Sequence, residues 1–372
     1  MNILIIDNST AFTGAFKCAL NEAELLSDKH RFVFVLNKTS TLVPMLQERG
    51  ITVYTLPMKE INRSIATLIQ YPFALISNTI RLRNIIRNEG IDIVQVNDFY
   101  NLLGACSRIF QSNIKLLTYV RFVPSSIPAA LRNFWIAIAQ RYSYKVIAVS
   151  DTVLKQLPTR ESTIRIYDPI NFSERINAPT ISGGNEIRIL YLANYIHGKG
   201  QDYALDAFIH AYAQNKNLRL LFAGGDMGLE KNKQFRQMLE ERVHLEGLAG
   251  VVSFQGFTAE IEKVIKDADI VLNFSDSESF SMTCLEASYY GTPVIATRCG
   301  GPEEIIVHDK TGLLVPRKNI EAMTEAILKL ANNTELRKSY GSAARHYVQE
   351  KFSVQTFIRN FENILKAVDN AQ

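Results

Sequence analysis

Residues 268–297, ADIVLNFSDSESFSMTCLEASYYGTPVIAT, place a serine-rich loop between an apolar run and a helical pattern, and a second apolar run follows. We expect a strand that ends near the first serine, then a helix over 282–290. Gly291 is suited to end this helix because glycine accepts the left-handed conformation. Glu278 then falls in the loop and Glu286 in the second helical turn. Because ligands of open α/β sheets bind at such turns, the stretch predicts a parallel sheet with a ligand site beside both glutamates.

The same alternation of apolar runs and helical patterns occurs twice along the chain. The expected strands are 2–7, 31–36, 52–56, 92–96, 114–120 and 145–150 in the first half, and 187–193, 218–224, 251–256, 268–274, 292–297 and 311–315 in the second. The runs are continuously apolar, which is typical of parallel strands covered on both faces. The predicted fold class is therefore α/β, with two Rossmann-like, doubly wound domains that face a cleft.

The domain boundaries follow from breaks in this rhythm. The predicted domains are 1–178 and 187–350. A polar stretch over 158–186 that contains Gly183-Gly184 interrupts the strands and helices, and we interpret it as a linker. The segment 351–372 is expected to be a helix that packs back on the first domain, because its apolar residues recur every three or four positions.

Composition limits the classes of protein and partner. Residues 1–180 hold 20 Lys and Arg against 13 Asp and Glu, whereas the remainder holds 21 against 24. A basic first half suits an anionic partner such as phosphate, phospholipid or nucleic acid, or is a random surface imbalance. The cysteines show no CxxC spacing, so neither a disulfide framework nor a zinc site is expected. The chain starts on an apolar strand without a signal peptide, which predicts a cytoplasmic location. The uncharged stretch 64–80 is interpreted as a buried or surface-docking helix.

The loop and helix start at 275–282 indicate the chemistry of the ligand. The unpaired N–H groups of a helix start bind anions such as phosphate. Carboxylates such as Glu278 and Glu286 accept hydrogen bonds from paired sugar hydroxyls. The arrangement suits a ligand with phosphates in the middle and a sugar at each end.

The segment 278–316, ESFSMTCLEASYYGTPVIATRCGGPEEIIVHDKTGLLVP, resembles the donor-binding signature of the retaining GT-B glycosyltransferases with a Glu-x7-Glu motif, the group 1 type. YLANYIHGKGQDYALDAF, FAGGD and VSFQGF resemble other strand ends of that family. VIAVSDTV and IYDPINF resemble the end of its first domain. The resemblance is specific over about 187–316 and weaker over 1–180. It implies a GT-B fold and a nucleotide-diphosphate sugar as donor.

The resemblance also implies roles for individual residues. Glu278 would hold the donor sugar at the reacting centre, Glu286 the ribose hydroxyls and Lys199 the diphosphate. Thr13-Gly14-Ala15 resembles the glycine turn that lets the donor phosphates approach the backbone. The implied donor-binding residues are Gly14, Asn194, Lys199, Gly256, Phe257, Ser279, Phe280, Ser281 and Glu286. The implied catalytic residues are Glu278 and Arg121.

The sequence departs from the family pattern at three places. Asn194 stands where the family usually has an arginine, so diphosphate binding rests more on Lys199 and the helix start. Gln95 and Asn97 lie at the end of the fourth strand, near the place where the family often has histidines. Arg121 replaces the usual active-site histidine. It could stabilise the leaving diphosphate, orient the acceptor, or be a structural arginine paired with a carboxylate. A histidine base is thereby disfavoured, which favours retention over inversion, although Asp98 or Asp7 could act as a base.

These observations lead to one principal hypothesis and several alternatives. The first domain would bind the acceptor, expected to be a lipid-linked glycan of surface polysaccharide assembly, and the second the nucleotide-sugar. Apart from that donor no cofactor or metal is implied, and no nucleic-acid partner. Peripheral contact with the inner face of the membrane, through Arg81, Arg83 and Arg87, is a further hypothesis. A GT-B nucleotide-sugar epimerase and a non-catalytic sugar-nucleotide binding protein stay open. A nicotinamide dehydrogenase is disfavoured because the GxGxxG fingerprint is missing.

Overall fold

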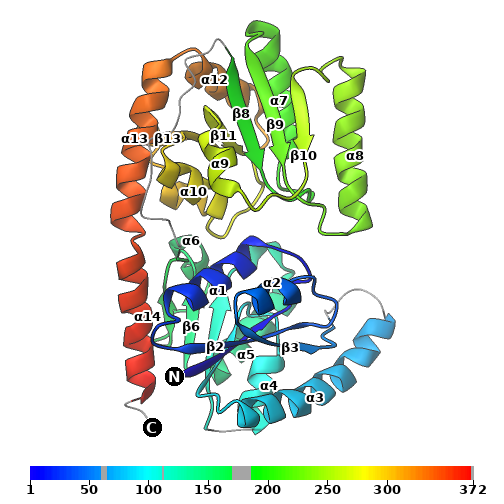
Figure 1. Ribbon diagram of the computed structural model, residues 1–372, viewed down its shortest axis with the longest axis vertical. Helices are drawn as coiled ribbons and strands as arrows, with labels where there is room; N and C mark the ends of the chain where they lie inside the picture. The colour runs from blue at the N-terminus through cyan, green and yellow to red at the C-terminus, as the bar shows by residue number, and fades with distance from the viewer. Residues whose placement is uncertain (60–64, 111–112, 170–185, 370–372) are drawn as a thin grey trace. The chain divides into compact units, whose positions relative to one another are not determined.

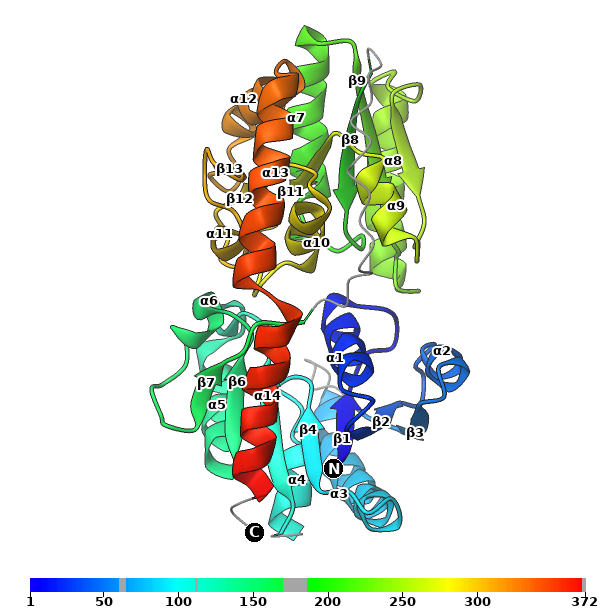
Figure 2. The same ribbon diagram turned by 60° about the vertical axis from the view of Figure 1, so that its left-hand side comes forward.

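A computed structural model describes residues 1–59, 65–110, 113–169 and 186–369 of the chain (Figures 1 and 2). The chain divides into two compact units. Unit 1 comprises Met1–Asn171 and Val354–Gln372, and unit 2 comprises Phe172–Ser353. The last helix therefore belongs to the first unit, although it is the last element in the sequence.

Unit 1 is built on a seven-stranded sheet in the order β3-β2-β1-β4-β5-β6-β7, and all the paired strands are parallel. The strands are β1 (Asn2–Asp7), β2 (Arg31–Asn37), β3 (Thr52–Leu56), β4 (Ile93–Val96), β5 (Lys115–Val120), β6 (Lys145–Ala148) and β7 (Thr163–Arg165). Continuous burial along β1 and β2 explains the unbroken apolar runs, since helices cover both faces.

Helices pack on both faces of this sheet. They are α1 (Gly14–Leu25), α2 (Val43–Glu48), α3 (Ile65–Asn88), α4 (Leu103–Phe110), α5 (Ala129–Tyr142), α6 (Asp151–Leu154) and α14 (Val354–Asp369), with a 3-10 turn over Pro124–Ser126. Leu82 of α3 and Leu103 of α4 share a core with Leu4 of β1. On the opposite face, Phe16 of α1 packs against Phe34 of β2, with ring centroids 6.1 Å apart.

Unit 2 repeats the plan with a six-stranded parallel sheet in the order β10-β9-β8-β11-β12-β13. Its strands are β8 (Ile187–Leu192), β9 (Leu218–Ala223), β10 (Val252–Gln255), β11 (Ile270–Asn273), β12 (Val294–Thr297) and β13 (Gly312–Val315). Its helices are α7 (Gln201–Gln214), α8 (Glu230–Leu245), α9 (Ile261–Lys266), α10 (Met282–Tyr290), α11 (Pro302–Ile305), α12 (Ile320–Ala331) and α13 (Thr334–Lys351). The order reverses between β8 and β11, which is the switch point at which such sheets bind ligands.

The predicted fold class is confirmed: both units are Rossmann-like parallel sheets, and each of the twelve expected strands is present. One interpretation was wrong in part. The expected linker over 158–186 contains β7 (Thr163–Arg165), which pairs with β6 and completes the first sheet. A three-residue strand is too short to show periodicity. The remainder of that stretch, with Gly183-Gly184, lies outside the described residues.

No helix in the described part of the chain has both the length and the apolar character that a membrane span requires. In the same part of the chain, no group of three or more His, Cys, Asp and Glu side chains is arranged to hold a metal ion.

Candidate functional site

The loops that follow β8 and β11 meet at the carboxyl edge of the unit 2 sheet. Lys199, in the loop after β8, places Nζ 2.8 Å from Oε1 of Glu278 in the loop after β11. Ser275 donates a hydrogen bond of 2.7 Å from Oγ to the same carboxylate oxygen. The two residues assigned to the donor diphosphate and the donor sugar are thus in direct contact, at the switch point of the sheet.

The Lys199–Glu278 pair is charged and only partly exposed. Burial lowers the pKa of the Lys199 ammonium, but the adjacent Glu278 carboxylate more than offsets this and leaves the pKa above its ordinary value. The exposed fraction is 33% for the Lys199 side chain and 12% for that of Glu278. A cation that solvent can still reach is suited to an incoming diphosphate.

The backbone of the Glu278 loop is fixed by the loop after β12. Glu278 N donates to the carbonyl of Cys299 at 3.1 Å, and Gly301 N donates to the carbonyl of Glu278 at 2.8 Å. A Cβ at Gly301 would lie 2.3 Å from Cα of Phe280, so only glycine allows the two loops to come so close. The GGP sequence after β12 therefore positions the candidate catalytic carboxylate.

Helix α10 begins at a residue in an uncommon conformation. Ser281 has φ 85°, which few non-glycine residues adopt. Its Oγ accepts from Nδ2 of Asn273 at 3.0 Å and from the backbone N of Cys284 at 3.4 Å, and so caps the helix. Glu286 lies in the second turn and is 6% exposed. Backbone strain concentrates at ligand sites, and this helix start is where the anion was predicted to bind.

Two neighbouring side chains of the predicted loop differ in exposure. Phe280 is 2% exposed, and its ring packs against Phe352 with centroids 5.3 Å apart. Its side chain is therefore part of the core, and its backbone is what the loop presents. Ser279 beside it is half-buried.

Asn194, which stands where the family usually has an arginine, has a structural contact. Its Oδ1 accepts from the backbone N of Gly225 at 3.0 Å and so ties the loop after β8 to the loop after β9. Phe257, after β10, is 55% exposed, and its Cβ would lie 3.4 Å from a Cβ at Gly225. Gly256 borders open space. These residues line the same carboxyl edge as Lys199.

Arg121 of unit 1 is buried among polar groups. It forms ion pairs with Asp168 and, at 3.7 Å, with Glu22. Its Nε donates to Oδ1 of Asn97 at 2.7 Å, and its guanidinium stacks on the ring of Tyr119 at 4.2 Å. These contacts match the structural alternative for Arg121. A catalytic part for it stays a prediction.

A small polar cavity of about 20 Å³ lies at the carboxyl edge of the unit 1 sheet and is lined by Asp7, Ala15 and Asp98, among others. Gly14 is exposed at the start of α1, which Thr13 caps. Burial raises the pKa of Asp98 to about 8 against the lowering effect of Arg121. Asp98 is therefore mostly protonated near neutral pH, which makes it a weak general base there.

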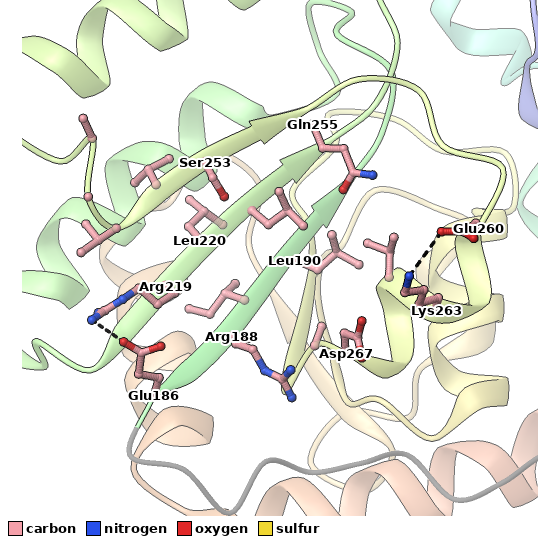
Figure 3. A pocket seen from close by; sticks show the side chains of 18 residues that line it. Glu186, Arg188, Leu190, Arg219, Leu220, Ser253, Gln255, Glu260, Lys263 and Asp267 are labelled. Carbon is pink, nitrogen blue, oxygen red and sulfur yellow. Dashed lines mark ion pairs between the residues drawn. The ribbon is translucent and has the colours of Figure 1, made fainter.

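A second cavity, of about 510 Å³, is not part of this arrangement. It lies between α9 and the face of β8, β9 and β10, as Figure 3 shows. Leu190 and Leu221 line it, and none of the donor-binding residues predicted from the sequence does. Its charged lining residues include two ion pairs, Arg219 with Glu186 and Lys263 with Glu260. The cavity therefore offers paired charges rather than a free cation for a diphosphate.

The sequence did not reveal all partners of these residues. The hydrogen bond from Ser275 to Glu278 was missed, because four alternating serines gave no reason to select one. Glu22 and Asp168 were missed as partners of Arg121, since each lies far from it in sequence. Only the fold brings such positions together.

Comparisons with known proteins agree with this geometry. The family Glycosyl transferases group 1 matches residues 172–347. This part of the chain resembles a group 1 glycosyltransferase domain. It is 27% identical over 295 residues to the uncharacterized glycosyltransferase MJ1178 of Methanocaldococcus jannaschii, a match that covers 77% of this chain and 79% of that protein. It is 23% identical to N-acetyl-alpha-D-glucosaminyl L-malate synthase of Bacillus anthracis, over 80% of each chain.

The fold is shared with a solved structure that contains UDP and glucose. The crystal structure of Anabaena Alr3699/HepE in complex with UDP and glucose matches with a TM-score of 0.84 and 21% identity, over 99% of this chain and all of that one. The predicted enzyme class, a glycosyltransferase, is confirmed by the matched domain and these relatives. The retaining mechanism and the residue roles stay predictions.

Proposed function

We propose that the protein transfers a sugar from a nucleoside-diphosphate donor to a glycan acceptor, with retention at the anomeric carbon. The observation that carries the proposal is the contact between Lys199 and Glu278 beside the capped start of α10, with the buried Glu286 one turn further on. Lys199 and the helix N–H groups would neutralise the diphosphate without a metal. Glu286 would accept hydrogen bonds from the ribose, and Glu278 from the transferred sugar.

The transfer step needs no base from the protein. The acceptor oxygen would form a bond to the anomeric carbon on the face from which the diphosphate oxygen leaves, and the acceptor proton would pass to that departing oxygen. The protonated state of Asp98 near neutral pH supports this route over one with a carboxylate base in unit 1. We further propose that unit 1 binds the acceptor, a lipid-linked glycan of surface polysaccharide assembly, since its basic composition suits a phosphate-bearing lipid.

The first test is calorimetric titration of the protein with UDP, GDP and ADP. One of them should bind tightly, and Glu286→Gln should weaken it by about tenfold to a hundredfold, because a hydrogen bond to a charged group contributes about 1.5–3 kcal/mol. Glu241→Gln, an exposed residue of α8, is the control and should leave binding unchanged. If no diphosphate binds, or if Glu286→Gln binds as well as the wild type, the donor site is wrong.

Turnover separates the proposal from its alternatives. Incubation of donor with a glycan acceptor should yield a product whose anomeric configuration, read by NMR coupling constants, equals that of the donor. The rate should persist in excess EDTA, because Lys199 and the helix start replace a metal. Epimerised donor formed without an acceptor would indicate an epimerase. Binding without any turnover would indicate a sugar-nucleotide binding protein.

A further inference from the structure

Helix α3 of unit 1 carries a row of exposed apolar side chains. Ile69, Phe73, Ile76 and Ile80 are 63%, 72%, 55% and 60% exposed. Their spacing of four, three and four residues places them within an arc of about 60° on one face of the helix, at 3.6 residues per turn. Isolated exposed apolar residues are ordinary, but a continuous row of large ones marks an interaction surface. We call these four residues the α3 stripe.

The stripe is not needed to hold α3 in place. The opposite face of the helix is already buried, since Leu82 and Ile86 are 0% and 1% exposed and belong to the unit 1 core. Leu75 packs against the same core. One apolar face of the helix therefore packs on the core of unit 1, while a second apolar face is exposed to solvent.

Basic residues continue the row toward the end of the helix. Arg83 and Arg87 follow Ile80 at spacings of three and four, so they lie on the face that carries the stripe. Arg81 is also exposed. Among the residues that the structure describes, none of the three arginines forms an ion pair with a carboxylate. The face thus changes from apolar to cationic along its length.

The neighbouring helices α4 and α5 also carry exposed apolar side chains and arginines. α4 packs on α3 and α5 on α4, and α4 ends in the exposed Ile109 and Phe110, while α5 exposes Phe134. Together α3, α4 and α5 contain six arginines, and no Asp or Glu occurs in them: Arg81, Arg83, Arg87, Arg108, Arg132 and Arg141. These helices carry only positive charges and expose apolar side chains. Both properties suit the surface of a bilayer, which is anionic at the headgroups and apolar beneath them.

We propose that the outer face of α3 docks on a bilayer that contains anionic phospholipid. The stripe would enter the boundary between headgroups and acyl chains, and Arg83 and Arg87 would contact lipid phosphates. The 24-residue helix, about 36 Å long, would lie in the plane of the interface. A second copy of this face is a poorer occupant, because it would bury arginines against helices that hold no acidic partner. The proposal is independent of the donor site, since no predicted donor residue lies in α3.

The test is flotation of the full chain with vesicles of phosphatidylcholine alone or mixed with anionic phosphatidylglycerol. The wild type should float with the mixed vesicles, more weakly with the neutral ones, and less as salt is raised, since salt screens the arginines. No nucleotide is added, so the result does not depend on the donor site.

Two variants separate the apolar and the cationic contributions. Phe73→Ser with Ile80→Ser should lower partitioning by at least tenfold on mixed vesicles, because two apolar side chains no longer leave water. Arg83→Glu with Arg87→Glu should lower it by more than tenfold and remove the preference for anionic lipid. The matched controls lie on α8 of unit 2: Leu245→Ser, an exposed apolar residue, and Lys231→Glu with Lys233→Glu, exposed cations. Both controls should float as the wild type does.

Three results would overturn the proposal. The first is no flotation of the wild type with either vesicle. The second is that the stripe variant floats as well as the wild type, or that the α8 controls lose as much flotation as the stripe variant does. The third is a concentration-dependent dimer in analytical ultracentrifugation that the stripe variant abolishes, without vesicle binding, which would assign the face to a second copy of the chain. Unchanged thermal unfolding of each variant excludes a folding defect.

Discussion

Ser281 combines strain and capping in one residue. Its φ of 85° costs energy for any side chain with a Cβ, while its Oγ caps α10. Ser281→Gly removes both the strain and the cap, whereas Ser281→Ala removes only the cap. We therefore expect Ser281→Ala to destabilise unit 2 by about 1–2 kcal/mol and Ser281→Gly by less. Denaturant unfolding of both variants measures the difference.

The capping serine of unit 1 provides the control for this comparison. Ser150 caps α6 from an ordinary extended conformation, with φ −159°. There glycine should keep only the smaller advantage that it has over alanine at any N-cap, because it relieves no strain at Ser150. If the difference in stability between the alanine and the glycine variant is the same at both serines, the conformation of Ser281 stores no strain.

Asp98 should make the stability of unit 1 depend on pH. Burial raises the pKa of its carboxyl from 3.8 to about 8, so the folded state holds a proton that the unfolded state has lost. Stability is then greatest below about pH 4 as far as Asp98 is concerned, and falls as pH rises toward 8, by at most about 1.4 kcal/mol per pH unit. Asp98→Asn should flatten this decline, since the amide cannot ionise. Trp135, the single tryptophan, packs against Phe99 and reports unfolding of unit 1 by fluorescence.

The variant keeps the local hydrogen bond, because the amide oxygen can accept from Phe99 N as Oδ1 of Asp98 does at 2.9 Å. Asp28→Asn, at an exposed position, should retain the wild-type pH profile. Glu22, whose pKa burial raises to about 7 despite Arg121, contributes a decline of its own that both variants keep. Identical profiles for Asp98→Asn and wild type would show that Asp98 is ionised in the folded protein.

At the scale of elements, the loop after β12 supports the loop after β11 through a close backbone approach. Gly301→Ala would place Cβ 2.3 Å from Phe280 Cα, although its φ of −51° is open to alanine. The loops must separate, which should cost about 1–3 kcal/mol and weaken diphosphate binding as Glu278 is displaced. Gly250→Ala, with nothing within 4 Å, is the control for stability. Wild-type affinity in Gly301→Ala would show that the spacing of these loops does not matter for binding.

Element positions were predictable from the sequence where burial is continuous. Long apolar runs such as 2–7 and 31–36 indicate strands because both faces of each sheet are covered. Gly291, in the left-handed conformation, ends α10 as expected. β7 was missed because its three residues, two half-buried and one exposed, are too few to show a period. A strand at the edge of a sheet is therefore harder to recognise from the sequence, because its residues are incompletely buried.

The candidate site was predictable in part for a similar reason. Lys199 and Glu278 follow strands that can be recognised, so the rule for carboxyl ends of parallel strands brings them together. The structural contact of Asn194 with Gly225 was not predictable, because it depends on how two loops approach each other. Local sequence patterns therefore indicate which edge of a sheet binds a ligand. Which side chains contact one another across two loops can be known only from the folded structure.

At the scale of the whole molecule, the two units have separate cores, and the last helix of the chain, α14, belongs to unit 1. Phe361 of α14 is fully buried, and Lys29 of unit 1 forms an ion pair of 2.5 Å with Glu362. Residues more than three hundred positions apart therefore belong to one folding unit. Because the cores are separate, we expect the two units to unfold in separate transitions, each with its own free energy of unfolding.

The last prediction follows from this division. Phe361→Ala should destabilise unit 1 by about 3–5 kcal/mol and shift the transition seen by Trp135 fluorescence, although the change lies near the C-terminus. A bound nucleoside diphosphate at a hundred times its Kd should stabilise unit 2 by about 2.7 kcal/mol and shift only the other transition, seen by circular dichroism. Phe208→Ala, in the core of unit 2, is the matched control and should leave the fluorescence transition in place. One coincident transition that all three changes move equally would mean that the units unfold as one, and that α14 contributes to a common core.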